Sequence, residues 1–184
     1  MMFKLLKQLA LGGTGLLVVV AVHAGINQMT GNFHEVIDGQ LYRSAQPDGD
    51  DLREYVEEHG IRTVLNLRDE DRGPWYQEES QTAEALGVRL VNYPFSSGKG
   101  LSVEEAEELA LLMETLPKPL LIHCEHGANR TGLAAAIYVD AVAKGSDLAA
   151  FWQLSPYYGH VPIKGIGRYA IFESYLDFQR LSDL

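Results

Sequence analysis

A short apolar strand that leads through a glycine-containing turn into an alanine-rich helix is the feature that most constrains how this chain can fold. Residues 120–132 read LLIHCEHGANRTG. The run Leu120-Leu121-Ile122 is typical of a strand covered on both faces, and the residues from Thr131 to Ala143 are predicted to be helical. A strand buried on both faces needs helices above and below its sheet, so this segment indicates an α/β fold.

The rest of the chain alternates predicted strands and helices in the same way. Residues 40–44, 63–67 and 88–93 have the β-branched or alternating pattern of strands. The predicted helices cover residues 48–59, 74–86, 102–116, 147–154 and 167–181. Among them, Ser102 and Glu105 form a capping box. We therefore predict a mostly parallel central sheet flanked by helices.

The N-terminal segment has the pattern of an export signal. Lys4 and Lys7 precede Leu9–Val22, a stretch of 14 uncharged residues that ends near Ala24. A positive flank, an apolar stretch of this length and a small-residue end are typical of a secretory signal peptide. An uncleaved membrane anchor is the alternative, because the apolar stretch extended to Ile26 approaches the roughly 20 residues that a span needs.

These observations divide the chain into three parts. Residues 1–26 are predicted to be a signal peptide or a single membrane anchor, residues 27–32 a polar linker, and residues 33–184 the folded domain. Positive residues before the apolar stretch favour a domain outside the cytoplasm, either in the periplasm or anchored in the inner membrane.

Charge and cysteine content exclude two classes of protein. Fifteen Lys and Arg residues against 25 Asp and Glu residues give a net charge of −10. That balance argues against nucleic acid as a partner, because phosphate backbones are bound by clustered basic side chains. Cys124 is the single cysteine of the chain, which excludes a disulfide framework within it.

The loop after the predicted strand at residues 120–122 has the features of an anion cradle. Loops at the carboxyl edge of a parallel sheet direct backbone N–H groups inward, and the following helix N-terminus adds positive potential. Gly127 lets the backbone bend, and Arg130 can grip two phosphate oxygens with its planar guanidinium. Such surroundings favour the thiolate of Cys124, which is placed to attack a bound phosphorus atom and form a phosphocysteine. Thr131 can donate its hydroxyl to the sulfur when it departs in the second, hydrolytic step.

The motif His-Cys-x5-Arg-Thr resembles the loop of the cysteine-dependent protein tyrosine phosphatases. The form HCEHGANRTG, together with LYRSAQP at residues 41–47, is similar to the small bacterial dual-specificity-like branch, whose exported members are tyrosine phosphatases of the cell envelope. The resemblance covers about residues 33–181. It implies a dual-specificity-phosphatase-like fold without cofactors, Cys124 as nucleophile and His123 as a group that tunes the thiol from behind. The phosphate-binding amides that it implies are those of Glu125, His126, Gly127, Ala128, Asn129 and Arg130.

A metal site is a poorer interpretation of the same loop. Its four potential ligands are consecutive, whereas zinc ligands come in spaced pairs, and the sequence contains no second cluster to complete a site. Arg130 in the same loop would repel a cation. We therefore predict no metal.

The resemblance leaves the general acid unassigned. In the family it is an aspartate on a loop before the cysteine-bearing strand, but residues 94–100, PFSSGKG, contain no acidic residue. Some relatives carry an aspartate directly before the arginine, where this chain has Asn129. Asp69 and Asp71 are the nearest substitutes, with Asp69 favoured because it lies closer to the end of a predicted strand. The alternatives are that Asp69 and Asp71 belong only to a solvated charged turn, or that the site has no acid. Glu125 is a weaker candidate for the acid.

Three functions follow from these patterns. The first is a phosphatase that acts on phosphotyrosine in exported or membrane proteins. The second has the same chemistry on phosphoinositides, inositol phosphates or phospholipid head groups, for which only Lys99 and Lys164 could supply extra positive charge. The third is a phosphate-binding module without turnover. The expected partner is thus a phosphorylated protein or a small phosphomonoester, together with the membrane if the N-terminal segment is not cleaved.

Overall fold

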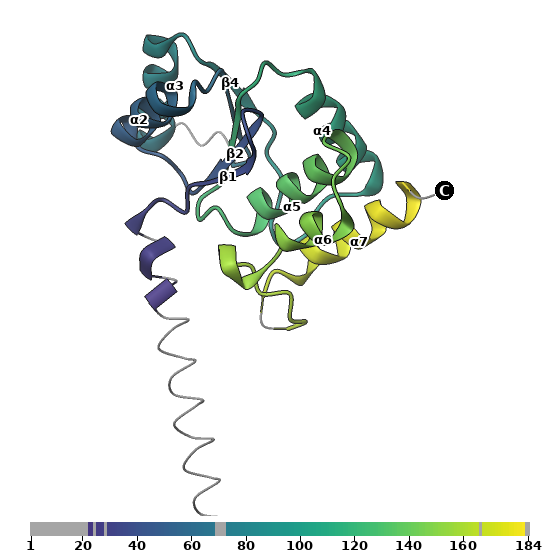
Figure 1. Ribbon diagram of the computed structural model, residues 1–184. Coiled ribbons are helices and arrows are strands. Elements are labelled where there is room, and N and C mark those ends of the chain that lie inside the picture. Colours follow the sequence, from purple (N-terminus) through teal and green to yellow (C-terminus); the bar gives the residue numbers. More distant parts are fainter. Residues whose placement is uncertain (1–21, 24, 28, 69–72, 166, 183–184) are drawn as a thin grey trace, which may run out of the picture.

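The central element is a five-stranded sheet in which the cysteine-bearing strand lies in the middle. The computed structural model describes the chain apart from residues 1–21, 24, 28, 69–72, 166 and 183–184 (Figure 1). The strand order is β1-β2-β5-β3-β4, with β1 antiparallel to β2 and the other pairs parallel. The strands are β1 (His34–Ile37), β2 (Leu41–Ser44), β3 (Thr63–Asn66), β4 (Arg89–Asn92) and β5 (Leu120–His123).

Helices cover both faces of this sheet, which confirms the predicted α/β class. On one side lie α2 (Gly49–His59) and α3 (Pro74–Leu86) (Figure 1). The other side carries α4 (Val103–Thr115), α5 (Asn129–Ile137), the π-helical turn η1 (Tyr138–Val142), α6 (Asp147–Trp152), the 3-10 turn η2 (Pro156–Tyr158) and α7 (Tyr169–Ser182).

Each inner strand contributes to two hydrophobic cores because successive side chains point to opposite faces. In β5, Leu120 and Ile122 belong to the core under α4, α5 and α7, whereas Leu121 belongs to the core under α2 and α3. Val64 and Leu65 of β3 divide in the same way. All four residues of β5 are buried, which explains why its sequence is an uninterrupted apolar run up to His123.

The predicted elements match the observed ones to within a few residues, as expected where local signals are strong. Ser102 caps α4 with the reciprocal bonds of a capping box, and Gly87 ends α3 in the left-handed conformation at φ 68°. Strand β1 was not predicted. It is four residues long and only partly buried at the sheet edge, so its sequence has no strong apolar pattern.

Two residues of the predicted linker at 27–32, Asn27 and Asn32, contact the folded domain. Asn27 and Asn32 are buried, and their side-chain amides donate to the backbone oxygens of Tyr157 and Tyr158 at 2.7 and 3.0 Å. Asn32 adopts the left-handed conformation at φ 49°, which asparagine tolerates better than most residues. Polar composition here therefore reflects hydrogen bonding to η2 rather than solvation.

The predicted signal peptide or anchor lies mostly outside the described residues. Of residues 1–26, the structure describes only 22, 23, 25 and 26, all in helical conformation. Within the described part of the chain, no helix has the length and apolar character needed to cross a bilayer.

Candidate active site

The loop that follows β5 lies where three parallel strands end together. His123, the last residue of β5, is in register with Ser44 of β2 and Asn66 of β3. Residues 124–128 then connect β5 to α5, which begins at Asn129. The loop therefore occupies the carboxyl edge of the sheet, where ligands bind in open α/β folds.

Three consecutive carbonyl groups of this loop are held from the outside by donors on other segments. The pairs are Glu125 O with Gln46 N–H at 3.4 Å, His126 O with Asn32 Nδ2 at 3.0 Å, and Gly127 O with Arg43 Nη2 at 2.8 Å. Because the carbonyls are fixed outward, the neighbouring N–H groups are free to turn toward the inside of the loop. This is the arrangement of an anion-binding cradle.

Arg43 is the most deeply buried of these donors. Its side chain is fully buried, and besides Gly127 it donates to the backbone and side-chain oxygens of Gln153 at 3.0 and 2.8 Å. Its guanidinium carbon lies 3.8 Å from the ring centroid of Tyr158, a cation–π contact. Burial lowers the pKa of Arg43 to about 10, so the side chain remains charged at neutral pH.

Gly127 is the one position of the loop that a side chain cannot occupy. Its φ of +66° is left-handed, and a Cβ there would lie 2.7 Å from Ala45 N and 2.8 Å from Ser44 O. The loop packs against the end of β2 at this point, so the close approach of two backbones requires glycine.

Cys124 lies at the floor of the cradle and is buried. Burial alone would raise the pKa of its thiol. The Thr131 hydroxyl, the backbone N–H groups of Thr131 and His126, and the positive charge of Arg130 oppose that effect, and together they lower the pKa of Cys124 below its ordinary value. The site therefore favours the thiolate, which is the nucleophilic form.

The first turn of α5 supplies the other groups around the sulfur. Arg130 donates from Nη1 to Leu67 O at 3.1 Å, which ties its guanidinium to the end of β3. Asn129 accepts at 2.8 Å from Nδ1 of His160, a fully buried imidazole whose pKa burial and the charge of Arg43 lower to about 4. His160 is thus neutral at pH 7 and fixes the side chain next to Arg130.

Behind the loop, His123 pairs with a carboxylate of α3. Its Nε2 lies 2.7 Å from Oε1 of Glu79, and both side chains are fully buried. The same carboxylate oxygen accepts from Gln46 at 3.3 Å. This contact connects the residue before the nucleophile to the helices on the opposite face of the sheet.

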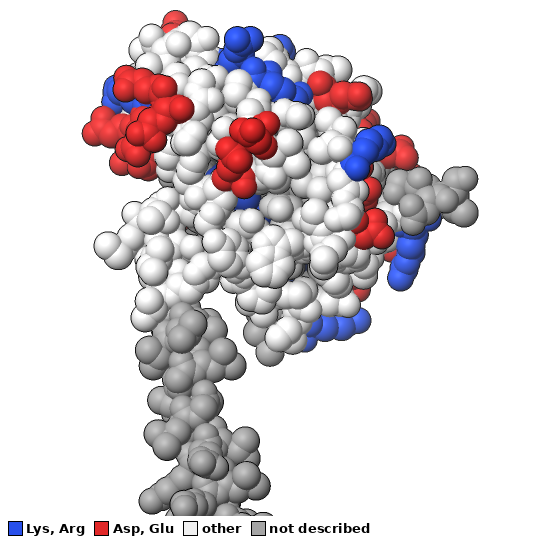
Figure 2. Space-filling model, viewed as in Figure 1, with Lys and Arg blue, Asp and Glu red and all other residues white. Residues whose placement is uncertain are grey.

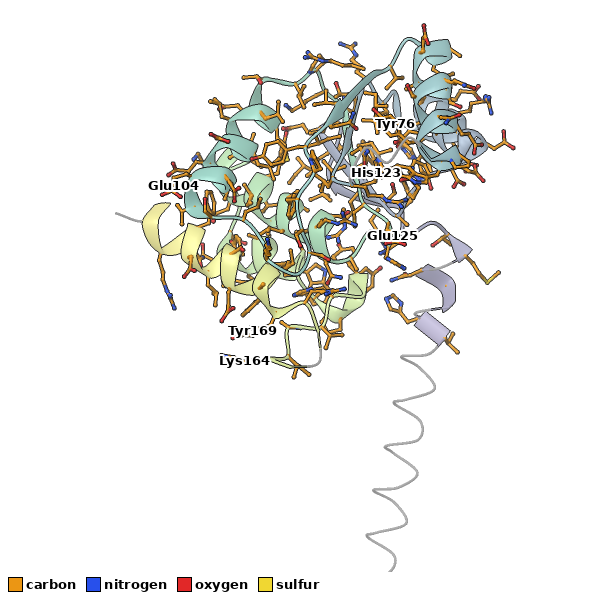
Figure 3. All side chains as sticks on the ribbon, turned by 180° about the vertical axis from the view of Figure 1, so that it is seen from behind. Tyr76, Glu104, His123, Glu125, Lys164 and Tyr169 are labelled. Atoms are coloured by element: carbon orange, nitrogen blue, oxygen red, sulfur yellow. The ribbon has the colours of Figure 1, made fainter. Side chains whose placement is uncertain are left out.

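The structure separates the remaining predicted residues into those near the loop and those away from it. Glu125 and His126 have exposed side chains, with Oε2 of Glu125 and Nδ1 of His126 3.8 Å apart, so their contribution inside the cradle is limited to the backbone. Lys164 lies beside Tyr169, well removed from His123 and Glu125 (Figure 3). Asp69 and Asp71 fall outside the described residues. Among the residues that are described, no three His, Cys, Asp or Glu side chains are grouped so as to hold a metal ion.

Four supporting residues were not identified from the sequence: Asn32, Arg43, Glu79 and His160. Each contacts the loop or its flanks from a segment at least 31 residues away in the chain. Arg43 alone carried a local signal, because it is a charged residue within a predicted strand; all four residues of that strand, β2, are buried.

Replacing Gly127 with alanine is expected to destabilise the loop. The left-handed conformation costs a residue with a Cβ roughly 1–2 kcal/mol, and the clash with β2 adds to this cost. Gly39→Ala is the matched control, because Gly39 has a similar φ of +63° with nothing within 4 Å of the added Cβ. Chemical denaturation should show a larger loss for Gly127→Ala, and equal losses would contradict the proposed close packing.

Replacing Thr131 with alanine is expected to raise the pKa of Cys124, because the hydroxyl that stabilises the thiolate is removed. The lowered pKa keeps the thiolate populated at pH values where an ordinary cysteine is protonated. The rate of iodoacetamide alkylation, measured against pH, should therefore rise at higher pH in the variant than in the wild type. Coincident profiles would show that the hydroxyl does not contact the sulfur in solution.

Comparisons with known proteins agree with this geometry. Dual specificity protein phosphatase TpbA from Pseudomonas aeruginosa (strain UCBPP-PA14) is 34% identical over 103 residues, which are 53% of this chain and 42% of TpbA. Inositol diphosphatase DSP2 from Oryza sativa subsp. japonica is 31% identical over 106 residues, 55% of this chain and 50% of that protein. The chain thus spans about half the length of these curated relatives.

A solved structure gives the same fold. The crystal structure of P. aeruginosa TpbA superposes with a TM-score of 0.59 at 23% identity, covering 80% of this chain and 91% of the chain in that crystal structure. The family described as "DSP-PTPase phosphatase fused to NAD+ Kinase" matches residues 18–160, a range that includes the cradle, Arg43 and His160. The chain therefore belongs to this DSP-PTPase phosphatase family.

Proposed function

We propose that the protein is a phosphomonoester hydrolase that works through a phosphocysteine intermediate. The observation that carries the proposal is the lowered pKa of a buried thiol at the floor of a loop whose carbonyls are held outward. A phosphate-binding module would need the inward N–H groups and Arg130, but it would not need a thiolate beneath them.

In the first step, the Cys124 thiolate attacks phosphorus in line with the ester oxygen, so a P–S bond forms as the P–O bond breaks. The leaving oxygen takes a proton from a general acid or departs as an anion. The inward N–H groups and Arg130 bind the equatorial oxygens and stabilise the charge of the transition state.

In the second step, water attacks phosphorus and the P–S bond breaks. The sulfur departs as a thiolate, which the Thr131 hydroxyl and the two N–H groups stabilise by the hydrogen bonds that lower its pKa. Inorganic phosphate leaves the cradle, and Cys124 is ready for another cycle.

Phosphotyrosine in proteins is the substrate that we favour. A second crystal structure of TpbA is described as a complex with pTyr, and TpbA is named a dual specificity protein phosphatase. The cradle contains Glu125 and Ala128 and no lysine, and Lys164 lies away from it, which disfavours a polyphosphate (Figure 3). Arg168, which lines a hollow with Asn129, is the basic side chain that such a substrate could still meet. Inositol phosphates are the second candidate, supported by the similarity to the rice inositol diphosphatase.

We also propose export of the domain, with the N-terminal segment as signal peptide or membrane anchor. Lys4, Lys7 and the uncharged stretch Leu9–Val22 support this assignment.

Hydrolysis of para-nitrophenyl phosphate in the presence of a chelator is the first test of the proposed activity. Its leaving group is good, so the outcome does not depend on the identity of the acid. The wild type should release nitrophenol and Cys124→Ser should not, because serine lacks the stabilised anion. A folded wild-type protein that binds phosphate without turnover would instead support the binding module.

Replacing Asp69 and Asp71 separately with asparagine tests the proposed acid. If one of them protonates the leaving oxygen, its loss should slow substrates with poor leaving groups by about 10²–10⁴-fold and para-nitrophenyl phosphate much less. Equal losses on both kinds of substrate would contradict the assignment, and no loss with either variant would leave the site without an aspartate acid on this turn.

A further inference from the structure

Exposed apolar side chains are concentrated in two segments of the chain that contact each other. Among the described residues, the large hydrophobic side chains that are most exposed come almost entirely from two segments, with Leu111 of α4 as the exception. We call this surface the apolar face. Its members are Val22, Ile26, Met29, Leu148, Trp152, Tyr157, Val161 and Ile163.

The two segments that supply the apolar face contact each other through Tyr157. Nε2 of His23 is 2.7 Å from Tyr157 O, and the two rings are 4.7 Å apart between centroids. Asn27 donates to the same oxygen at 2.7 Å. Trp152 lies against Tyr157 with ring centroids 5.8 Å apart. Tyr157 therefore joins the N-terminal segment to α6.

The apolar face is also free of acidic residues in a strongly acidic chain. All 25 Asp and Glu residues lie outside residues 1–34 and 148–172, the two stretches that contain every member of the face. Lys164 and Arg168 are the charged residues of the second stretch, and both are basic. In Figure 2 the surface beside the N-terminal segment correspondingly shows no Asp or Glu side chains, which are coloured red.

This combination fits a lipid bilayer better than it fits another protein. Trp and Tyr side chains are favoured at the boundary between lipid and water, because each has an apolar body and a polar atom. Lys164 and Arg168, which belong to the same stretch of chain, would be attracted to anionic head groups, from which an acidic surface would be repelled. Residue 22, where the uncharged stretch Leu9–Val22 ends, is itself a member of the face.

We propose that the apolar face contacts the surface of a membrane containing anionic lipid, with Trp152 and Tyr157 at the level of the head groups. The proposal concerns only this surface and does not depend on the phosphatase activity. It fixes the cradle relative to the bilayer, because Tyr158, the neighbour of Tyr157, accepts from Asn32 and packs against Arg43. Asn32 and Arg43 are two of the three residues that hold the carbonyls of the cradle outward. Substrates that reach the cradle would then be phosphorylated groups close to the membrane surface.

The two tryptophans of the chain provide a direct test. Trp152 belongs to the apolar face, whereas Trp75 lies on α3, which covers the opposite face of the sheet from α6, under the guanidinium of Arg68 at 3.8 Å (Figure 1). The full chain is reconstituted into vesicles of phosphatidylcholine and phosphatidylglycerol that contain phospholipid brominated near the head group. Trp75→Phe leaves Trp152 as the reporter, and Trp152→Phe leaves Trp75 as the control.

Brominated lipid should quench the emission of Trp152 and leave that of Trp75 unchanged. Adding Ile163→Glu to the Trp75→Phe chain should reduce the quenching, whereas Leu111→Glu, which is also exposed but lies outside the face, should not. If brominated lipid changed the emission of neither Trp152 nor Trp75, the proposal would be overturned. So would unquenched Trp152 emission that changes with protein concentration, because a second copy of the chain would then cover the face.

Discussion

The hydrogen bond from the buried guanidinium of Arg43 to the carbonyl of Gly127 is the interaction on which the site depends most. It turns this peptide outward at the point where the loop is closest to β2 and no side chain fits. Arg43 is fully buried, and an unpaired charge there would cost several kcal/mol, so its bonds to Gln153 and its contact with Tyr158 are also needed. The same group therefore links the cradle to the sheet, to the end of α6 and to η2. Removing it would leave the cradle and the end of α6 without their common donor, and η2 without its cation–π contact.

The position of β5 in the sheet explains why one loop can be supported from so many directions. Because β5 lies between β2 and β3, the segments that follow both neighbours reach the cradle: Gln46 after β2 and Leu67 after β3. Helix α3, on the opposite face of the sheet from α5, adds Glu79 behind His123. A strand at the edge of the sheet would have only one such neighbour. Cys124 is thus placed by the sheet topology, and the lowered pKa of its thiol follows from the first turn of α5 together with the N–H group of His126.

The local part of this arrangement could be predicted from the sequence, and the long-range part could not. Cys124, Arg130 and Thr131 are close in the chain, and their spacing on a strand, loop and helix determines which way they face. The sequence predicts that Asn32 belongs to a polar linker. Its polarity does not indicate that its side chain donates to His126 O across 94 positions of the chain. His160 lies beyond α6 and reaches Asn129 only through tertiary packing. The general acid was predicted from position alone, because Asp69 and Asp71 follow β3. Leu67 at the end of β3 contacts Arg130, and the role of the two aspartates stays a prediction.

The central claim is that Cys124 carries the phosphoryl group during turnover, and trapping this species tests it most directly. Wild-type protein mixed with para-nitrophenyl phosphate is quenched within the first turnovers by alkaline denaturant, and the intact chain is analysed by mass spectrometry. The account predicts a population heavier by one phosphoryl group, located on the peptide that contains Cys124 and absent after alkylation of the thiol. Turnover without any phosphorylated chain, or with the phosphoryl group on another residue, would contradict it.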